Sequence, residues 1–224
     1  MKKVKCIILL LLNLVAMPLL AEEKQKIDWS KVNPKNWFFK ADSVSEVIVD
    51  ITSVDQLLGE PIGGLRAKSI EKYMLKQAKR FNNLPNAKVS VVREGQIVKI
   101  NIPMDMLFLP NDTVVSAVGS GKIIDVIADF VDEGLVDLLI ATHWDNQGSS
   151  RYKVDITEKR AKAIYDAFVE RELAKRLMPT LPLSDKYPIY NNDSFATRRL
   201  NKRVTFYFLP NDAMKRKARM FMLK

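Results

Sequence analysis

His143, which is the only histidine of the chain, opens a polar run whose side chains are able to bind charged groups. The run THWDNQGSSRYKVDITEKRA spans residues 142–161 and also holds Asp145, Ser149 and Arg160. Asp145 and Arg160 carry opposite charges, and between them they are able to hold the ammonium and the carboxylate of a zwitterion such as an α-amino acid centre. In the alternative, the two side chains pair with each other at the surface, for about 0–1 kcal/mol.

The elements on either side of this run determine whether the two charges meet. LVDLLIATH, residues 135–143, is apolar throughout and predicts a central strand covered on both faces. The spacing of apolar residues predicts a helix over Thr157–Leu177, capped by Asp155 or Thr157. Arg160 then falls in the first turn of that helix, where free N–H groups favour a bound anion. The loop 146–155 would bring both charges to the carboxyl edge of the sheet, where ligands bind in α/β proteins.

Strand and helix signals alternate along the rest of the chain. A period of three to four predicts a helix over 66–81, and a second helical segment spans 116–133 and ends before Gly134. Short β-branched runs predict a hairpin and a final strand at residues 88–92, 96–102 and 203–210. This alternation predicts an α/β sandwich.

Other chemistry finds little support in the residue types. His143, Asp145 and Ser149 suggest a hydrolytic triad, but Ser149 lies on a flexible loop without a nucleophile elbow or an oxyanion feature. One histidine and one cysteine, Cys6, do not supply the usual ligands of a metal site. We therefore expect no enzymatic activity, no metal and no cofactor.

The N-terminus has the pattern of a secretory signal peptide over residues 1–21. Lys2, Lys3 and Lys5 precede an apolar run that is shorter than the ~20 residues of a membrane span, and Ala21 precedes two glutamates. The alternative is a single membrane anchor. Removal of the three lysines lowers the formal charge from +10 to +7. Export argues against nucleic acid as the partner of this basic chain, and leaves wall polymers and lipid headgroups as anions.

Two motifs resemble the signatures of the OmpA-like peptidoglycan-binding family. HWDNQGSSRYKVDITEKRA resembles the family pattern HTDNxGSxxYNxxLSxxRA, and PIYNNDSFATRRLNKRV resembles PxxxNxTxxGRxxNRRV. The second motif matches without a gap at Pro188, Asn192, Arg198, Asn201, Arg203 and Val204. Leu107 and Phe108 match a further pair that follows the family's entry strand. The resemblance covers roughly residues 88–210, about half of the chain.

This resemblance implies a fold, a ligand and a set of site residues. The fold is a βαβαβ two-layer α/β sandwich with a mixed sheet, and the ligand is the diaminopimelate of the peptidoglycan stem peptide. Asp145 would take the ammonium of that residue, and Arg160 would take the carboxylate. Possible supporting residues are His143, Trp144, Asn146, Thr157, Asn192, Arg198 and Arg203. The sequence departs from the family pattern at Thr142, Trp144, Lys153 and Thr197, and it lacks the usual strand after the main helix.

The chain then divides into four predicted parts. A signal peptide (1–21) precedes an N-terminal extension (22–87, with a helix near 66–81), the OmpA-like domain (88–210) and a basic tail (211–224) that makes at most a peripheral membrane contact. Clustered aromatic side chains between Trp29 and Phe39 are expected to pack either on the main domain or on a partner. In the second case they predict contact with another envelope protein through residues 22–65. The predicted function is to tether the envelope, or an envelope complex, to the wall from the periplasm or the inner face of the outer membrane. The alternative is a scaffold subunit of a secretion or motor assembly, in which wall binding is weak or lost.

Overall fold

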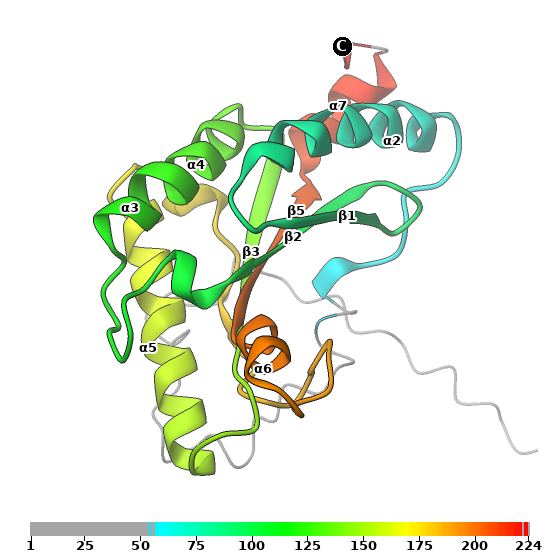
Figure 1. Ribbon diagram of the computed structural model, residues 1–224. Coiled ribbons are helices and arrows are strands. Elements are labelled where there is room, and N and C mark those ends of the chain that lie inside the picture. The colour runs from blue at the N-terminus through cyan, green and yellow to red at the C-terminus, as the bar shows by residue number, and fades with distance from the viewer. Residues whose placement is uncertain (1–53, 55–56, 221, 224) are drawn as a thin grey trace, which may run out of the picture. The chain divides into compact units, whose positions relative to one another are not determined.

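A mixed sheet runs through the computed structural model, which describes residues 54, 57–220 and 222–223. Its strand order is β1-β2-β5-β3-β4, so that β5 is the middle strand (Figure 1). Neighbouring strands are antiparallel except β3 and β4, which are parallel. The strands are β1 Lys88–Val92, β2 Ile97–Pro103, β3 Val136–His143, β4 Leu181–Pro182 and β5 Arg203–Pro210.

Alternation along the strands sorts their side chains onto two faces of the sheet, because successive residues of a strand point to opposite sides. In β5, Val204, Phe206 and Phe208 join the main hydrophobic core, whereas Tyr207 joins a smaller cluster on the other face. The smaller cluster is covered by Leu181 and Leu183 and by the partly buried side chains of Val54, Leu57 and Leu58. The two clusters therefore mark the two sides of the sheet.

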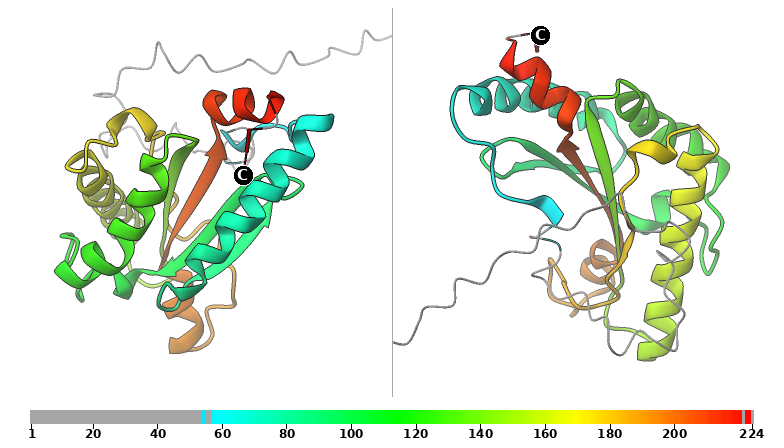
Figure 2. Two further views of the ribbon diagram at one scale, coloured as in Figure 1. Left: turned by 90° about the horizontal axis from the view of Figure 1, so that it is seen from above. Right: turned by 180° about the vertical axis from the view of Figure 1, so that it is seen from behind.

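Helices cover the face that carries the main core. The helices are α2 Leu65–Ala78, α3 Ala117–Gly119, α4 Asp125–Asp132, α5 Ser150–Val169, α6 Phe195–Asn201 and α7 Asp212–Arg219, and a π-helical turn, Ser120–Ile124, joins α3 to α4. Short 3-10 turns lie at Lys79–Asn83, Met104–Met106 and Ala174–Arg176. Side chains of α2, α4, α5 and α7 enter the main core, and α2 and α7 lie side by side (Figures 1 and 2).

An aromatic cluster joins these helices to the sheet. The ring centroid of Phe81, just after α2, lies 5.5 Å from that of Phe130 in α4 and 5.1 Å from that of Phe208 in β5. The centroids of Phe130 and Phe208 lie 5.2 Å apart. Rings at these separations stabilise each other beyond the burial of their area. The helix predicted near 66–81 therefore packs in the same core as the strands of the OmpA-like region.

Most of the predicted elements are confirmed. The helix over 66–81, the hairpin, the helical segment 116–133 and the final strand appear within a few residues of their predicted bounds. Gly134 adopts a φ of 74°, as expected of a residue that ends a helix. The strand over 135–143 is buried on both faces. The predicted fold class, a two-layer α/β sandwich with a mixed sheet, is confirmed.

The predicted bounds of the main helix are wrong. We expected Thr157–Leu177, but α5 begins at Ser150 and ends at Val169. Ser149 is the N-cap, and its side chain accepts a hydrogen bond from the backbone N–H of Tyr152 at 3.2 Å. Neither Asp155 nor Thr157 caps the helix. Beyond Val169 the chain turns, with a positive φ of 62° at Glu172, so that Leu177 is buried outside the helix.

The edge of the sheet beyond β3 is short. β4 has only two residues, Leu181 and Pro182, which pair with Ala141 and Thr142 of β3. An isolated bridge between Leu138 and Leu177 adds a second point of contact. The strand after the main helix, which the sequence was expected to lack, is therefore present in a minimal form.

Some predictions lie outside the described residues. They are the signal peptide and the aromatic residues Trp29, Trp37, Phe38 and Phe39. Within residues 54, 57–220 and 222–223, no helix is both long enough and apolar enough to cross a bilayer.

Gly119 provides a test of the packing between α3 and the 104–109 segment. Its backbone is ordinary right-handed helix (φ −64°), but a Cβ there would lie 2.8 Å from the Leu107 Cα and 2.9 Å from the Leu107 carbonyl oxygen. Since backbone atoms cannot move aside easily, we expect Gly119→Ala to lower the free energy of unfolding by about 1–3 kcal/mol. Denaturant unfolding measures this change.

Gly121→Ala is the matched control. It lies two residues away, and a Cβ there meets nothing closer than the Asp125 carboxylate at 3.9 Å. We expect this variant to equal the parent or to gain up to about 1 kcal/mol from the higher helix propensity of alanine. Equal stability of the two variants would contradict the close approach of α3 to Leu107.

Candidate functional site

Asp145 is a buried carboxylate just beyond the carboxyl end of β3. It is 1% exposed, and its Oδ1 accepts a hydrogen bond from the backbone N–H of Gln147 at 3.2 Å. The Nζ of Lys202, a residue just before β5, lies 3.3 Å from Oδ2. This is ion-pair distance, but Oδ2 accepts no hydrogen bond of good geometry from the described residues. One carboxylate oxygen therefore retains unused hydrogen-bonding capacity.

Arg160 is a buried guanidinium in the middle of α5. It is 4% exposed, and its Nε donates to the carbonyl oxygen of Asp112 at 2.8 Å. Its Nη2 lies 3.5 Å from the carbonyl oxygen of Leu109, which is a weak contact. Burial lowers the pKa of Arg160 below its ordinary value. The guanidinium is therefore held by carbonyl groups of the 109–112 segment.

The location of Arg160 corrects its predicted setting. It is ten residues beyond Ser150, the first residue of α5, which at ~1.5 Å per residue is about 15 Å from the helix start. The free N–H groups of that start therefore do not share an anion with Arg160. The connection from β3 to the helix is also shorter than the expected 146–155 loop, because the helix begins at Ser150.

Trp144 lies between the cations of this site. Its ring centroid is 5.2 Å from the Arg160 Cζ and 5.4 Å from the Lys202 Nζ. Phe108 provides a second ring for Arg160, with its centroid 4.8 Å from Cζ. Such contacts are each worth about 0.5–2 kcal/mol, with the larger values at desolvated sites. The departure from the family pattern at Trp144 thus provides an aromatic surface for two cations.

Asp145 and Arg160 do not pair with each other. No ion pair joins them within the described part of the chain, where the cation near Asp145 is Lys202. With Lys202 the site contains two cations and one anion. A zwitterion that binds here would bring its carboxylate to Arg160 and its ammonium to Asp145, in competition with Lys202.

Thr157 and Lys153 make contacts within the protein. The Thr157 hydroxyl donates to the Lys153 carbonyl oxygen at 2.8 Å, and the Thr157 carbonyl accepts from the Thr142 hydroxyl at 2.9 Å. Thr142 therefore ties β3 to α5. The Lys153 ammonium pairs with Asp185. Asn146 is exposed, and its Oδ1 accepts from the Gln147 side chain at 2.9 Å.

His143 and Arg203 form a buried pair where β3 and β5 meet. The Nδ1 of His143 lies 3.2 Å from the Nη2 of Arg203, whose Nη2 also donates to the Tyr187 carbonyl oxygen at 3.0 Å. Burial lowers the pKa of Arg203 to about 10. Burial, and after it the charges of Arg203 and Lys99, hold the pKa of His143 well below its ordinary value. The imidazole is therefore neutral at pH 7, and Arg203 supports the loop around Tyr187.

Asn192 and Arg198 organise the segment before β5. Arg198 Nη1 donates to the Asn192 carbonyl oxygen at 3.0 Å, and Asn201 Nδ2 donates to the Asn192 side-chain oxygen at 2.9 Å. The Asn201 Oδ1 accepts from the backbone N–H groups of Ile189 and Tyr190, both at 3.0 Å. These bonds hold the loop that follows Pro188, and they give these residues a supporting role.

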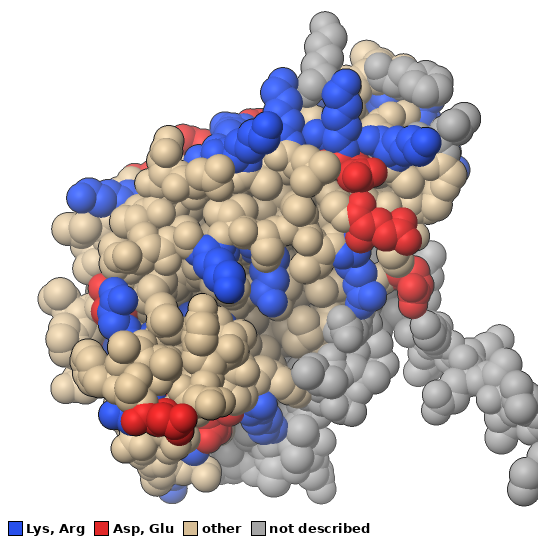
Figure 3. All heavy atoms as spheres, turned by 45° about the vertical axis from the view of Figure 1, so that its right-hand side comes forward, with Lys and Arg blue, Asp and Glu red and all other residues tan. Residues whose placement is uncertain are grey.

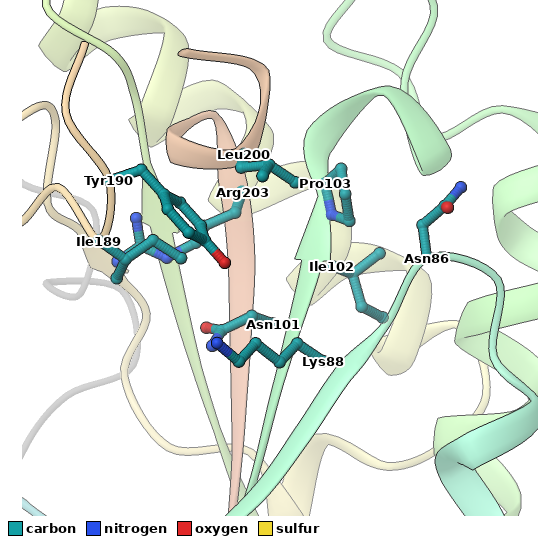
Figure 4. Close-up of a pocket in the computed structure, with 9 residues that line it drawn as sticks. All are labelled: Asn86, Lys88, Asn101, Ile102, Pro103, Ile189, Tyr190, Leu200 and Arg203. Atoms are coloured by element: carbon teal, nitrogen blue, oxygen red, sulfur yellow. The ribbon is translucent and has the colours of Figure 1, made fainter. Parts of the chain in front are cut away.

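A small pocket lies elsewhere, where the β1–β2 hairpin meets the 189–203 segment (Figure 4). The Lys88 ammonium lies 5.9 Å from the centroid of the Tyr190 ring. The pocket is lined by Asn86, Lys88, Asn101, Ile102, Pro103, Ile189, Tyr190, Leu200 and Arg203. No carboxylate lines it, so it lacks the group that would bind the ammonium of a zwitterion.

Ser149 and His143 have other roles than those of a triad. The Ser149 hydroxyl caps α5, and the His143 Nδ1 faces Arg203. In the described ranges, no group of three or more His, Cys, Asp or Glu side chains is placed to hold a metal ion.

The site includes residues that the sequence did not single out. Lys202 reaches Asp145, and the carbonyl groups of Leu109 and Asp112 hold Arg160. Lys202 lies within the second motif, directly before Arg203, and its charge was the available signal. The contacts of the backbone carbonyl groups could not be predicted, because every residue has such a group.

Comparison with known proteins supports the fold. No family model matches the chain. YfiB of Escherichia coli (strain K12) is 29% identical over 100 residues, which are 44% of this chain and 62% of that protein. The chain thus spans about three fifths of the length of this curated relative.

Two solved structures are similar in three dimensions. A MotB-like protein from Desulfovibrio vulgaris superposes with a TM-score of 0.57 at 18% identity, covering 66% of this chain and 100% of that one. The cell wall anchor of the T6SS from Pseudomonas aeruginosa superposes with a TM-score of 0.50 at 20% identity, covering 63% and 97%. At these identities the likeness shows a shared fold. The chain shares its mixed-sheet α/β fold with these two structures.

His143 makes stability depend on pH. Its pKa is lowered in the folded chain, so the unfolded chain binds the proton more readily below about pH 6.5. The stability from the neutral imidazole is present above that pH and is lost as the pH falls, by up to about 1.4 kcal/mol per pH unit. We expect the free energy of unfolding to decrease between pH 7.5 and 5.5, with a smaller decrease in His143→Gln.

The comparison isolates one group, because His143 is the only histidine. The raised pKa values of Asp137 and Glu158, both caused first by burial, are common to the two proteins and cancel in the difference. Denaturant unfolding at both pH values provides the measurement. An identical pH dependence in parent and His143→Gln would show that the imidazole is not buried in its neutral form.

Proposed function

We propose that this protein is an exported, non-enzymatic protein that binds peptidoglycan through the diaminopimelate of the stem peptide. It would tether the envelope, or a complex within it, to the cell wall. Its location would be the periplasm, at the wall or the inner face of the outer membrane. The similarity of its fold to a MotB-like protein and to a T6SS cell wall anchor supports this proposal.

The observation that carries the proposal is the pair of separately buried charges beside Trp144. A buried charge that is not both ion-paired and fully hydrogen-bonded is costly, and proteins retain such groups mainly where a function needs them. Arg160 is 4% exposed and its hydrogen bonds go to neutral carbonyl groups. Asp145 is 1% exposed and has one oxygen without a hydrogen bond. A ligand with a carboxylate and an ammonium on one carbon would satisfy both groups.

Lys202 gives this site a built-in competitor. Its ammonium lies 3.3 Å from the Asp145 Oδ2, where the ligand's ammonium would bind. Since the Lys202 side chain is 32% exposed, it is able to swing into solvent when a ligand arrives. Its displacement costs an ion pair and a cation–π contact, so the affinity for the wall should be lower than that of an unobstructed site.

The second candidate is a scaffold subunit of a secretion or motor assembly in which wall binding is weak or lost. The contacts of Lys202 with Asp145 and of Arg160 with Asp112 favour it, because both functional charges already have partners in the protein. The two candidates predict different outcomes when the partner of Asp145 is removed. A second contact through residues 22–65 fits both, and there Val54, Leu57 and Leu58 already pack against the sheet.

Removal of Asp145 tests the proposed function. A charge-assisted hydrogen bond is worth about 1.5–3 kcal/mol, so Asp145→Ala should weaken binding to purified diaminopimelate-type wall by roughly tenfold or more. Asp155→Ala is the control, because it removes the same charge from a surface ion pair with Lys159. Sedimentation with wall at matched salt measures both. General attraction of a basic protein to an acidic wall would instead strengthen in both variants.

Removal of Lys202 separates the two candidate functions. In the tether, Lys202→Ala frees Asp145 for the ligand's ammonium, so wall binding should increase several-fold although the net charge becomes less positive. In the scaffold, the same variant should leave wall binding as weak as in the parent, or absent. The co-sedimentation assay reports the difference. Weaker binding of Lys202→Ala would contradict the competition and would make Lys202 itself a wall contact.

A further inference from the structure

The positive charge of the protein is concentrated on two helices. α2 with the turn after it (residues 65–83) and α7 hold ten Lys and Arg side chains and only two carboxylates, Glu71 and Asp212. Their net charge is therefore +8, out of +10 for the whole chain. Figure 3 shows these cations gathered along the edge of the molecule that α2 and α7 form. The rest of the chain therefore carries a net charge of only +2.

The cations of α2 form a row that faces away from the core. Lys68, Lys72 and Lys76 recur every four residues and are exposed, whereas Ile70 and Met74 on the other side of the helix are fully buried. In α7, Met214 and Ala218 are buried, and Arg216, Lys217 and Arg219 are exposed. Within the basic tail, residues 212–219 thus form a packed helix that extends the cationic surface of α2.

The lysine row of α2 has no carboxylate partner among the residues that the structure describes. Among the described residues, no carboxylate lies within ion-pair distance of Lys68, Lys72 or Lys76. Within the cationic surface, Arg80 pairs with Glu133 and Lys215 pairs with Asp212. Rows of like charge repel one another, and helix pairs of like charge at this spacing are destabilising. An external anionic surface would relieve this repulsion.

Apolar side chains lie among the cations. Leu75 on α2 is 40% exposed, and Met220 and Met222 after α7 are 59% and 58% exposed. A cationic helical surface that also presents apolar side chains is typical of proteins that bind at a membrane interface. Most cations of α2 are lysines, whose ammonium acts as a point charge and suits a diffuse layer of headgroups. The guanidinium of arginine is better suited to two hydrogen bonds with one defined carboxylate or phosphate.

We propose that the α2/α7 surface binds a bilayer that contains anionic phospholipid. The surface lies at the opposite end of the β3–β5 pair from the candidate site. His143 pairs with Arg203 at the site end, and Val136 pairs with Pro210 just before α7. Seven residue steps of about 3.3 Å separate the two ends by roughly 23 Å. The domain is therefore able to contact a membrane with one end and the wall with the other.

Co-sedimentation with vesicles tests this inference on the full chain in its processed form. At 100 mM salt we expect binding to vesicles of phosphatidylglycerol and phosphatidylcholine, and at least tenfold weaker binding to phosphatidylcholine alone. The triple variant Lys68→Glu, Lys72→Glu and Lys76→Glu should reduce binding to the anionic vesicles at least tenfold. Circular dichroism checks its fold, and the corresponding triple glutamine variant serves if the glutamates prevent folding.

The matched control changes the charge by the same amount at three lysines outside the α2/α7 surface. Lys122, Lys175 and Lys186 are exposed and lie outside α2 and α7, so their triple change to glutamate should weaken vesicle binding by less than about threefold. Replacing Met220 and Met222 by serine should weaken the binding that persists at 500 mM salt, where charge attraction is screened.

Three results would overturn the inference. The first is an equal loss of vesicle binding in the α2 triple glutamate variant and in the control triple glutamate variant. The second is equal binding of the parent to anionic and neutral vesicles, and the third is no binding of the parent to either. Binding to purified wall by the α2 triple variant is measured beside it. If the variant loses wall binding but still binds vesicles as the parent does, the α2/α7 surface binds the wall and not lipid. Wall binding that it keeps would leave the site at Asp145 and Arg160 independent of this surface.

Discussion

The burial of the Arg160 guanidinium is the constraint on which the candidate site depends. A charged group taken out of water has to be solvated by the protein, and here two carbonyl groups and the rings of Phe108 and Trp144 do so. The 109–112 segment must therefore lie against the middle of α5. The close packing of Gly119 on Leu107 holds the start of that segment in place. A substitution that loosens this packing should weaken the site from a distance.

Asp145 is held by a different set of contacts. β3 ends beside β5, so Asp145 comes within reach of Lys202, and the loop before β5 is fixed by Asn201. The two charges of the site thus depend on separate supports, one from the helical layer and one from the loop between β4 and β5. The His143–Arg203 pair joins β3 to β5 at this end of the sheet. This division explains how two opposite charges remain apart instead of neutralising each other.

Local patterns were sufficient to predict most of the fold. The period of two in the strands, the period of three to four in α2, and Gly134 each depend on near neighbours in the chain. The start of α5 was missed because Gly148, Ser149 and Ser150 have the composition of a loop, although Ser149 is a helix cap. The buried Lys153 and Arg160 also interrupt its apolar stripe. Residue types were sufficient to select Asp145 and Arg160 as site residues. The role of Lys202 could not be predicted, because it depends on the end of β3 lying beside the start of β5 in the folded chain.

Calorimetric titration of the protein with two stem tripeptides tests the central claim most directly. One tripeptide ends in diaminopimelate, and the other ends in lysine, which lacks the distal carboxylate. If Arg160 binds that carboxylate, the parent prefers the diaminopimelate peptide by roughly tenfold or more, and Arg160→Lys loses most of this preference because it cannot form the bidentate contact. Equal affinity of the parent for the two peptides, or a preference unchanged in Arg160→Lys, would contradict the account.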